Sequence, residues 1–317
     1  MPFYLAPMAE ISHRALRELI EGFGGCDGYF SEMISAPALL VGGTFEKYYI
    51  DNGPKPEKCV FQLVGSGLEV MSKAAGILDR IECAGIDINM GCSAPLIRKT
   101  GAGAAWMASV DRAGELINKV RPQVKRRLSV KLRLGFKEDF EYLVRFCRRL
   151  EDEGVELITL HPRLVSEKFK RLARWDYVGK LRGELKIPVA GNGDILSAEE
   201  LVKRAAGPCD AVMAGRAAVR QPWIFKQAKE EEFNRGVHGV RGVNIEEIGL
   251  KFIELLSKYQ PQEFHISRAK RFFAFFCENL KWGTFVYNQI NREETLAGIE
   301  KVWTDFFSTA DTNLFCN

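Results

Sequence analysis

The 317-residue sequence predicts a (β/α)8 TIM barrel followed by a small all-helical C-terminal domain. Eight short apolar runs alternate with amphipathic stretches within about the first 220 residues, which suits a closed barrel better than an open sheet. The runs are continuous rather than alternating, a pattern typical of parallel strands covered by helices. Polar residues also recur just after the runs, where the active site of such a barrel lies.

The expected elements follow one another in the order that a barrel requires. The apolar runs are residues 3–8, 28–30, 59–64, 86–89, 128–134, 157–161, 187–190 and 211–214. Helical patterns occupy residues 14–23, 68–83, 112–120, 139–154 and 198–206. The second repeat is the weakest, and residues 35–56 behind it hold several Gly and Pro residues, so they predict a long loop. We place the barrel domain in residues 1–235.

A second domain is expected after the barrel. Residues 234–242 read NRGVHGVRG, a Gly-rich basic stretch that predicts a linker. Beyond it only helical patterns occur, for example at residues 245–258, 268–280 and 293–307. We therefore expect a helical domain in residues 243–317.

The bulk composition is that of a soluble globular protein. The net charge of +4 and the pI of about 8.5 permit a polyanionic partner without demanding one. Eight cysteines without a C-x-x-C pair, and no H-E-x-x-H segment, predict no metal site and suggest buried thiols in a reducing compartment. No signal peptide or membrane-length apolar run is evident, so we expect a cytoplasmic protein without membrane contact. We also expect a monomer with no obligate protein partner.

The polar residues after the runs form a ring around the expected barrel mouth. A single one, such as Gln62, could be a buried amide with satisfied hydrogen bonds, but chance does not place one after nearly every strand. In strand order the ring comprises Pro7, Met8, Gln62, Asn89, Gly91, Cys92, Lys131, Arg133, His161, Arg163, Asn192, Gly193, Asp194, Gly215 and Arg216.

The ring divides by chemistry. The loops after the seventh and eighth strands of a barrel commonly bind phosphate, and here they read GNGD and AGRA. Glycines let backbone N–H groups approach an anion, and Arg216 offers a bidentate donor. A phosphorylated cofactor is expected there, with Lys131 and His161 facing its ring system. A cation beside a flavin would stabilise the reduced, anionic form.

Cys92 lies on a Gly-rich loop, NMGCSAPLIRKTGAG, at the active face. A cysteine in such a place can act as a nucleophile or as a proton donor. No His–Asp pair is evident nearby to generate a thiolate, although His161 could approach in space. Proton donation next to a hydride-transferring flavin is therefore favoured over acyl transfer.

These residues resemble the tRNA-dihydrouridine synthase family. The matching segments run in order along nearly the whole chain: LAPMAEISHRALR, SEMISA, FQLVGS, DINMGC, GAGAA, VKLRLG, ITLHPR, PVAGNGDI, VMAGRAAVRQPWIF and, in the helical part, RAKRFFAFFCENLK. The combination of DINMGC with GNGDI and the later GR is specific, although each is weak alone.

The resemblance implies an enzyme that reduces a uridine in tRNA to 5,6-dihydrouridine with FMN as cofactor and NADPH as reductant. It implies that Cys92 protonates C5 of the uracil while flavin N5 delivers hydride to C6, with Asn89 near the uracil. It also implies that FMN is bound by Gln62, Lys131, His161, Asn192, Gly193, Gly215 and Arg216. From the ring we add Pro7, Met8 and Asp194 at the cofactor, and Arg133 and Arg163 at the substrate.

The sequence departs from the family pattern at four places. Ser93 follows the cysteine where the family has proline, and Pro95 comes two positions later. The family's basic residue three positions after the cysteine is missing. Pro162 replaces the glycine of the family's H-G-R, so that this chain reads His161-Pro162-Arg163. In the segment resembling Y-x-G-x-A-D-W, Arg171 and Arg174 replace glycine and aspartate.

Two rival functions stay open: an FMN barrel that reduces a free pyrimidine, and a catalytically inactive RNA-binding barrel. Three basic clusters favour tRNA over a free base: residues 125–127, residues 168–174, and Arg268 with Lys270 and Arg271. We expect the last three to share a helix face that binds tRNA phosphates. Alternatively, they dock the two domains.

Overall fold

The computed structural model, which describes residues 1–233 and 243–309, confirms the closed eight-stranded parallel barrel. The expected linker, residues 234–242, lies outside the described residues. Each strand pairs with the next, and β1 pairs with β8 to close the barrel. The strands are β1 (Phe3–Leu5), β2 (Gly28–Ser35), β3 (Cys59–Val64), β4 (Gly85–Met90), β5 (Arg127–Gly135), β6 (Leu157–Leu164), β7 (Val189–Asn192) and β8 (Ala211–Ala214).

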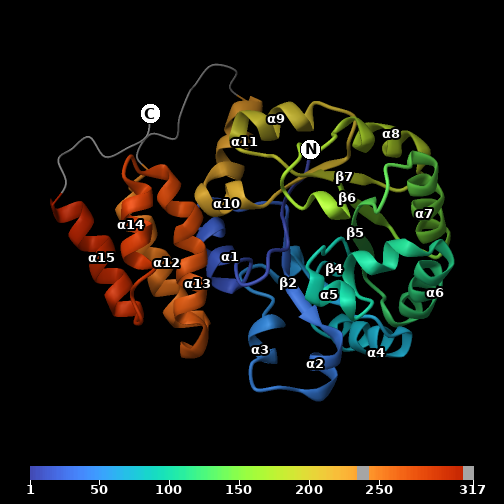
Figure 1. Cartoon of the computed structure of the whole chain (residues 1–317), viewed down its shortest axis with the longest axis horizontal. Helices are drawn as coiled ribbons and strands as arrows, with labels where there is room; N and C mark the ends of the chain where they lie inside the picture. Colours follow the sequence, from blue (N-terminus) through green and yellow to red (C-terminus); the bar gives the residue numbers. More distant parts are fainter. Residues whose placement is uncertain (234–242, 310–317) are drawn as a thin grey trace.

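Helices cover the outside of the barrel (Figure 1). They are α1 (Arg14–Glu21), α4 (Leu68–Asp79), α6 (Val110–Val120), α7 (Phe140–Asp152), α8 (Asp176–Glu184), α9 (Ala198–Ala205), α10 (Arg216–Arg220) and α11 (Ile224–Phe233), with the short α5 (Pro95–Lys99) behind β4. Their inner faces are apolar, as where α7 buries Leu143, Phe146 and Leu150. Short 3-10 turns are η1 (Pro56–Lys58), η2 (Gly103–Ala108), η3 (Arg121–Gln123), η4 (Val165–Glu167) and η5 (Cys277–Asn279).

The second repeat differs from the expectation. Strand β2 runs on to Ser35, because the polar Glu32 in its middle is buried against the helical part of the chain rather than exposed. Two short helices, α2 (Ala36–Val41) and α3 (Glu46–Tyr49), occupy part of the predicted loop. Helix α8, missing from the expected series, buries only Val178 and Leu181, so its amphipathic signal in the sequence is weak.

In the described part of the chain after residue 242, four helices follow the barrel: α12 (Ile245–Tyr259), α13 (Gln262–Phe276), α14 (Gly283–Ile290) and α15 (Leu296–Thr309). They form a bundle beside α1 and α10 (Figure 1). Aromatic rings fill the bundle, with Phe252 stacked on Phe272 at 3.7 Å between ring centroids. Helix α13 begins at Gln262 rather than at residue 268, directly after Pro261. The buried apolar cluster of the barrel continues into the bundle without interruption.

The seven cysteines within the described residues are free thiols, and six of them are buried. Cys92 is the partly exposed exception. Among the helices of residues 1–233 and 243–309, none has the length and apolar character that a bilayer crossing requires.

Candidate active site

A cavity of about 590 Å³ opens at the carboxyl ends of the strands. With the exception of Gln62, the structure brings the whole predicted ring to its walls, so residues on or directly after β1, β4, β5, β6, β7 and β8 converge on one place. The volume is in the range of cofactor and substrate pockets.

The cavity is strongly cationic. Within the described residues its walls hold six Lys and Arg side chains and one carboxylate, Asp194; the cations are Lys131, Arg133, Arg163, Lys168, Arg216 and Arg271. Burial, and then repulsion from Arg133, lowers the pKa of Lys131 to about 8. Burial and the Arg163 charge likewise lower the pKa of Arg133 to about 10. An anionic ligand would relieve both effects, because it supplies the missing opposite charge.

His161 is neutral in this cavity and its tautomer is defined. Burial lowers its pKa well below the ordinary value, and the surrounding cations, Lys131 first, lower it further. Arg163 lies 2.8 Å from Nε2 of His161. A guanidinium can only donate, so Nε2 is the acceptor and Nδ1 carries the proton. His161 therefore has a donor available at Nδ1.

Arg163 and Arg133, which were expected at the substrate, line the cavity and also hold the neighbouring loops in place. Arg163 donates to the backbone oxygen of Arg171 at 2.5 Å and to the Asp194 carboxylate at 2.5 Å, in addition to His161. Arg133 donates to the backbone oxygens of Gly91 at 3.0 Å and Lys168 at 3.1 Å. Both side chains are almost fully buried because loop carbonyls surround them.

Cys92 lies at the cavity wall on the loop after β4. The N–H groups of Gly91 and Cys92 both donate to Oδ1 of Asn89, at 3.1 and 2.9 Å, which fixes the backbone of the cysteine. Gly103 packs directly beneath, with φ +59, and a Cβ there would lie 3.0 Å from the Cβ of Cys92. Gly103, the second glycine of the GAGAA segment, thus allows this loop to pack against Cys92.

Gln62 does not reach the cavity, in contrast to its expected place in the cofactor set. It is fully buried inside the barrel, where it accepts from Asn89 at 2.8 Å and donates to Asp87 at 2.7 Å. The reason is its position on β3, level with Asp87 of β4, below the strand ends that line the mouth.

The loops expected to bind phosphate meet at the cavity as predicted from their order. Gly193 has φ +117, and a Cβ there would lie 2.8 Å from the His161 ring, so only glycine fits. The guanidinium of Arg216 lies over the ring of Phe169, 4.8 Å from its centroid. Phe169 lines the cavity but was not among the predicted site residues, although its match to the Tyr of the family segment was a usable signal.

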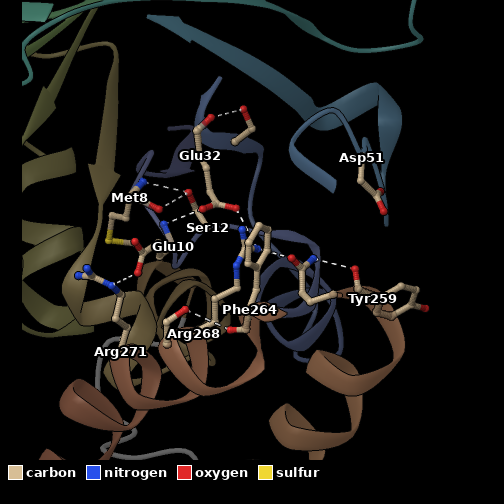
Figure 2. Close-up of polar contacts among 12 residues, drawn as sticks. Met8, Glu10, Ser12, Glu32, Asp51, Tyr259, Phe264, Arg268 and Arg271 are labelled. Atoms are coloured by element: carbon tan, nitrogen blue, oxygen red, sulfur yellow. Dashed lines mark hydrogen bonds and ion pairs between the residues drawn. The ribbon is translucent and has the colours of Figure 1, made fainter. Parts of the chain in front are cut away.

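Helix α13 forms part of the cavity wall through Arg271 and Phe275. Arg271 is half-exposed and pairs with Glu10, which follows β1. Figure 2 shows this pair beside a second one, in which Arg268 reaches Glu32 of β2. Arg271 was among the predicted substrate residues, whereas Phe275 was not, because nothing in its sequence context separates a cavity position from a core position.

Arg268 was expected on the exposed tRNA-binding face, and the structure contradicts this. Its side chain is 1% exposed and lies 3.1 Å from the Glu32 carboxylate, itself 3% exposed. It also bonds Gln260 and lies over the rings of Phe264 and Tyr49. Burial raises the pKa of Glu32, although the Arg268 charge opposes the shift. Arg268 therefore docks the helical bundle to the barrel, the alternative considered for this cluster.

A cationic cavity with a partly exposed thiol, at the carboxyl end of a (β/α)8 barrel, defines the class of protein: a barrel enzyme with a site for an anionic ligand. The chain belongs to the dihydrouridine synthase family, because the family profile described as Dihydrouridine synthase (Dus) matches residues 4–303. Members named tRNA-dihydrouridine synthases are flavin-dependent oxidoreductases, so membership makes this chain an enzyme of that kind and implies a flavin.

Several curated relatives agree. A probable tRNA-dihydrouridine synthase of Aquifex aeolicus is 32% identical over 72% of this chain and 72% of its own length. A tRNA-dihydrouridine(16) synthase of Neisseria meningitidis is 29% identical over 84% of this chain and 83% of its own. The human tRNA-dihydrouridine(47) synthase [NAD(P)(+)]-like protein is 31% identical, but the match spans only 35% of its length.

Among solved structures the barrel fold is shared at low identity. A variant of NCR from Zymomonas mobilis has a TM-score of 0.52 at 15% identity, covering 73% of this chain and 86% of its own. A morphinone reductase mutant in complex with tetrahydroNAD has a TM-score of 0.51 at 10% identity, covering 72% and 86%.

Proposed function

We propose that the protein reduces a uridine in tRNA to 5,6-dihydrouridine, with FMN as cofactor and NADPH as hydride source. The observation that carries the proposal is the convergence of Cys92 with six cationic side chains around one cavity, in a member of this family. The proton donor and the anion site then face the same cavity, as a flavin-dependent reduction of a pyrimidine requires.

The residues present fit FMN. The cationic walls suit its phosphate and its reduced ring, and Gly193 lets the His161 ring pack against the loop after β7. Arg216, Gly193 and Gly215 would hold the phosphate, while Lys131 and the Nδ1 donor of His161 would face the ring system. The wall around the cofactor would be completed by Pro7, Met8, Asn192 and Asp194. Gln62 would not contact FMN but would orient Asn89 through their hydrogen bond. When bound, FMN supplies hydride to C6 of the uracil.

Cys92 would donate its thiol proton to C5. Its backbone is held by Asn89, whose side-chain oxygen is already used by two N–H groups. The remaining N–H of Asn89 can therefore only donate, which suits a carbonyl oxygen of uracil. His161 does not serve as base to the thiol, because its only acceptor nitrogen faces Arg163.

tRNA would approach the cavity from two sides. A uridine within folded RNA must be flipped out to enter, so most of the affinity comes from backbone phosphates. Lys168, Lys170 and Arg171 are exposed on the loop after β6, and the exposed Arg271 and the partly exposed Lys270 lie on α13. Residues 243–317 would then act as the tRNA-binding domain of a cytoplasmic monomer with no obligate protein partner.

The experiment compares two substrates. The purified protein with NADPH should form dihydrouridine in an unmodified tRNA transcript but not in free uridine or uracil, as mass spectrometry of the digested RNA would show. Heat should release FMN, and Arg216→Ala should lose it while remaining folded.

Reduction of the free pyrimidine alone would favour the rival free-base enzyme. A colourless protein that gains no flavin would favour an inactive RNA-binding barrel, and release of FAD would contradict the phosphate site.

The low pKa of Lys131 predicts a pH dependence of FMN binding. Lys131 loses its charge as pH rises through about 8 in the free protein. Bound FMN would favour the charged form, so affinity should fall above pH 8 by up to about tenfold per pH unit, as linkage of one proton dictates. Fluorescence titrations with FMN between about pH 6.5 and about pH 9.5 would measure how the affinity changes. Lys131→Met should bind more weakly with a flatter profile; an unchanged profile would contradict the assignment.

A further inference from the structure

Asp87 is a fully buried carboxylate inside the barrel, two positions before Asn89 on β4. No step of the proposed reaction uses it directly. Burial raises its pKa to about 6, against the opposing effect of hydrogen bonds from Ser129 and Gln62, so it is ionised at neutral pH. A buried charge of this kind needs a reason, because removing a carboxylate from water is unfavourable.

Asp87 lies at the end of a continuous chain of hydrogen bonds that begins at the cysteine. The N–H of Cys92 donates to Oδ1 of Asn89 at 2.9 Å. Nδ2 of Asn89 donates to Oε1 of Gln62 at 2.8 Å, and Nε2 of Gln62 donates to Oδ2 of Asp87 at 2.7 Å. The Ser129 hydroxyl donates to the other carboxylate oxygen at 2.6 Å. Every donor in the chain points towards Asp87.

The direction of the chain is determined at both ends. A carboxylate only accepts, so the Gln62 amide must turn its nitrogen towards Asp87 and its oxygen towards Asn89. Backbone N–H groups only donate, so Asn89 must turn its oxygen towards Cys92 and its nitrogen towards Gln62. The two requirements agree. Hydrogen bonds aligned in this way strengthen one another where water is excluded, and a charged acceptor at the end adds to the effect.

We propose that Asp87 is a positioning residue that acts through Gln62 and Asn89 to hold Cys92 in place. This rests on the proposed role of Cys92. Without the carboxylate, the buried Gln62 nitrogen loses its acceptor and the amide can turn over. Asn89 then loses its partner, and the backbone of Cys92 loses its anchor.

The test compares three variants by stopped-flow kinetics of the two half-reactions. In Asp87→Leu, oxidation of the reduced enzyme by tRNA should slow by about tenfold to a hundredfold more than reduction of the flavin by NADPH, the size of loss that a misplaced reacting group causes. Asp87→Asn should largely restore the ratio, because its amide oxygen still accepts from Gln62. Ser129→Ala is the matched control: it removes a bond to Asp87 outside the chain and should leave the ratio unchanged.

A double variant separates this inference from the proposed function. In a Cys92→Ala background, Asp87→Leu should cause little further loss, because residues that act through one another are not additive. If Cys92→Ala slows the tRNA step but Asp87→Leu does not, or if their losses add, the positioning role is wrong while the function stands. If Cys92→Ala has no effect, the proposed role of the cysteine fails first. Should Asp87→Leu not fold, Asp87→Ala takes its place with the same expected pattern.

Discussion

Replacing Cys92 by alanine should slow the oxidation of the reduced enzyme by tRNA by about 10²–10⁴-fold, the usual loss when a positioned general acid is removed. FMN binding and flavin reduction by NADPH should persist, because neither requires the thiol. The structure supports this separation, since the Cys92 backbone is held by Asn89 and not by its own side chain. Stopped-flow absorbance of the flavin would measure each half-reaction by itself.

The matched control is Cys209→Ala. Cys209 is buried just before β8 and is not among the residues of the cavity wall, so both half-reactions should keep the parent rates. Cys92→Ser should lie between alanine and the parent enzyme, because a hydroxyl is a weaker acid of similar shape. A Cys92→Ala enzyme that tRNA oxidises at the parent rate would exclude the cysteine as the proton donor.

The second large effect is a loss of stability at the interface between the barrel and the helical bundle. Arg268→Met should lower the free energy of unfolding by about 3–5 kcal/mol, because it leaves Glu32 buried without its partner. Glu32 also accepts from the backbone N–H of Glu10 at 2.6 Å, so the loop carrying Pro7 and Met8 into the cavity should loosen with it (Figure 2). Urea denaturation and FMN titration would measure the two consequences.

Arg271→Met provides the control one turn further along α13. Its pair with Glu10 is 54% and 40% exposed at the two side chains, so its loss should change stability by only about 0–1 kcal/mol. It should instead weaken tRNA binding and reduce the salt dependence. The double variant Glu32→Leu with Arg268→Met should regain most of the lost stability. Equal losses for Arg268→Met and Arg271→Met would contradict the assignment of docking to one and RNA contact to the other.

The barrel was predictable because its signal is local and repeated. Continuous apolar runs such as residues 59–64 form strands wherever helices cover them, and β3 matches that run at both ends. The second repeat was not predictable to the same extent, because Glu32 reads as an exposed residue unless its partner some 236 positions later is known. Similarly, α8 buries too few apolar residues to stand out.

The cavity residues were predictable for a related reason. In a parallel barrel every strand ends at the same face, so a polar residue at each strand end must face a common centre. Cys92, Lys131, His161 and Arg216 follow that rule. Gln62 does not, because it lies within its strand, level with Asp87, and its side chain is buried inside the barrel.

The sequence by itself determined the barrel, the ring of polar residues at its mouth and the family, since each depends on order and spacing along the chain. Only the tertiary structure decided which cations stay accessible to a ligand. Arg163, Arg133 and Arg268 look like Arg216 and Arg271 in the sequence, but carbonyls and carboxylates from distant segments bury the first three, whereas Arg271 stays half-exposed beside Glu10. A guanidinium in water and one among buried acceptors differ by their neighbours alone, and those neighbours come together only when the chain folds.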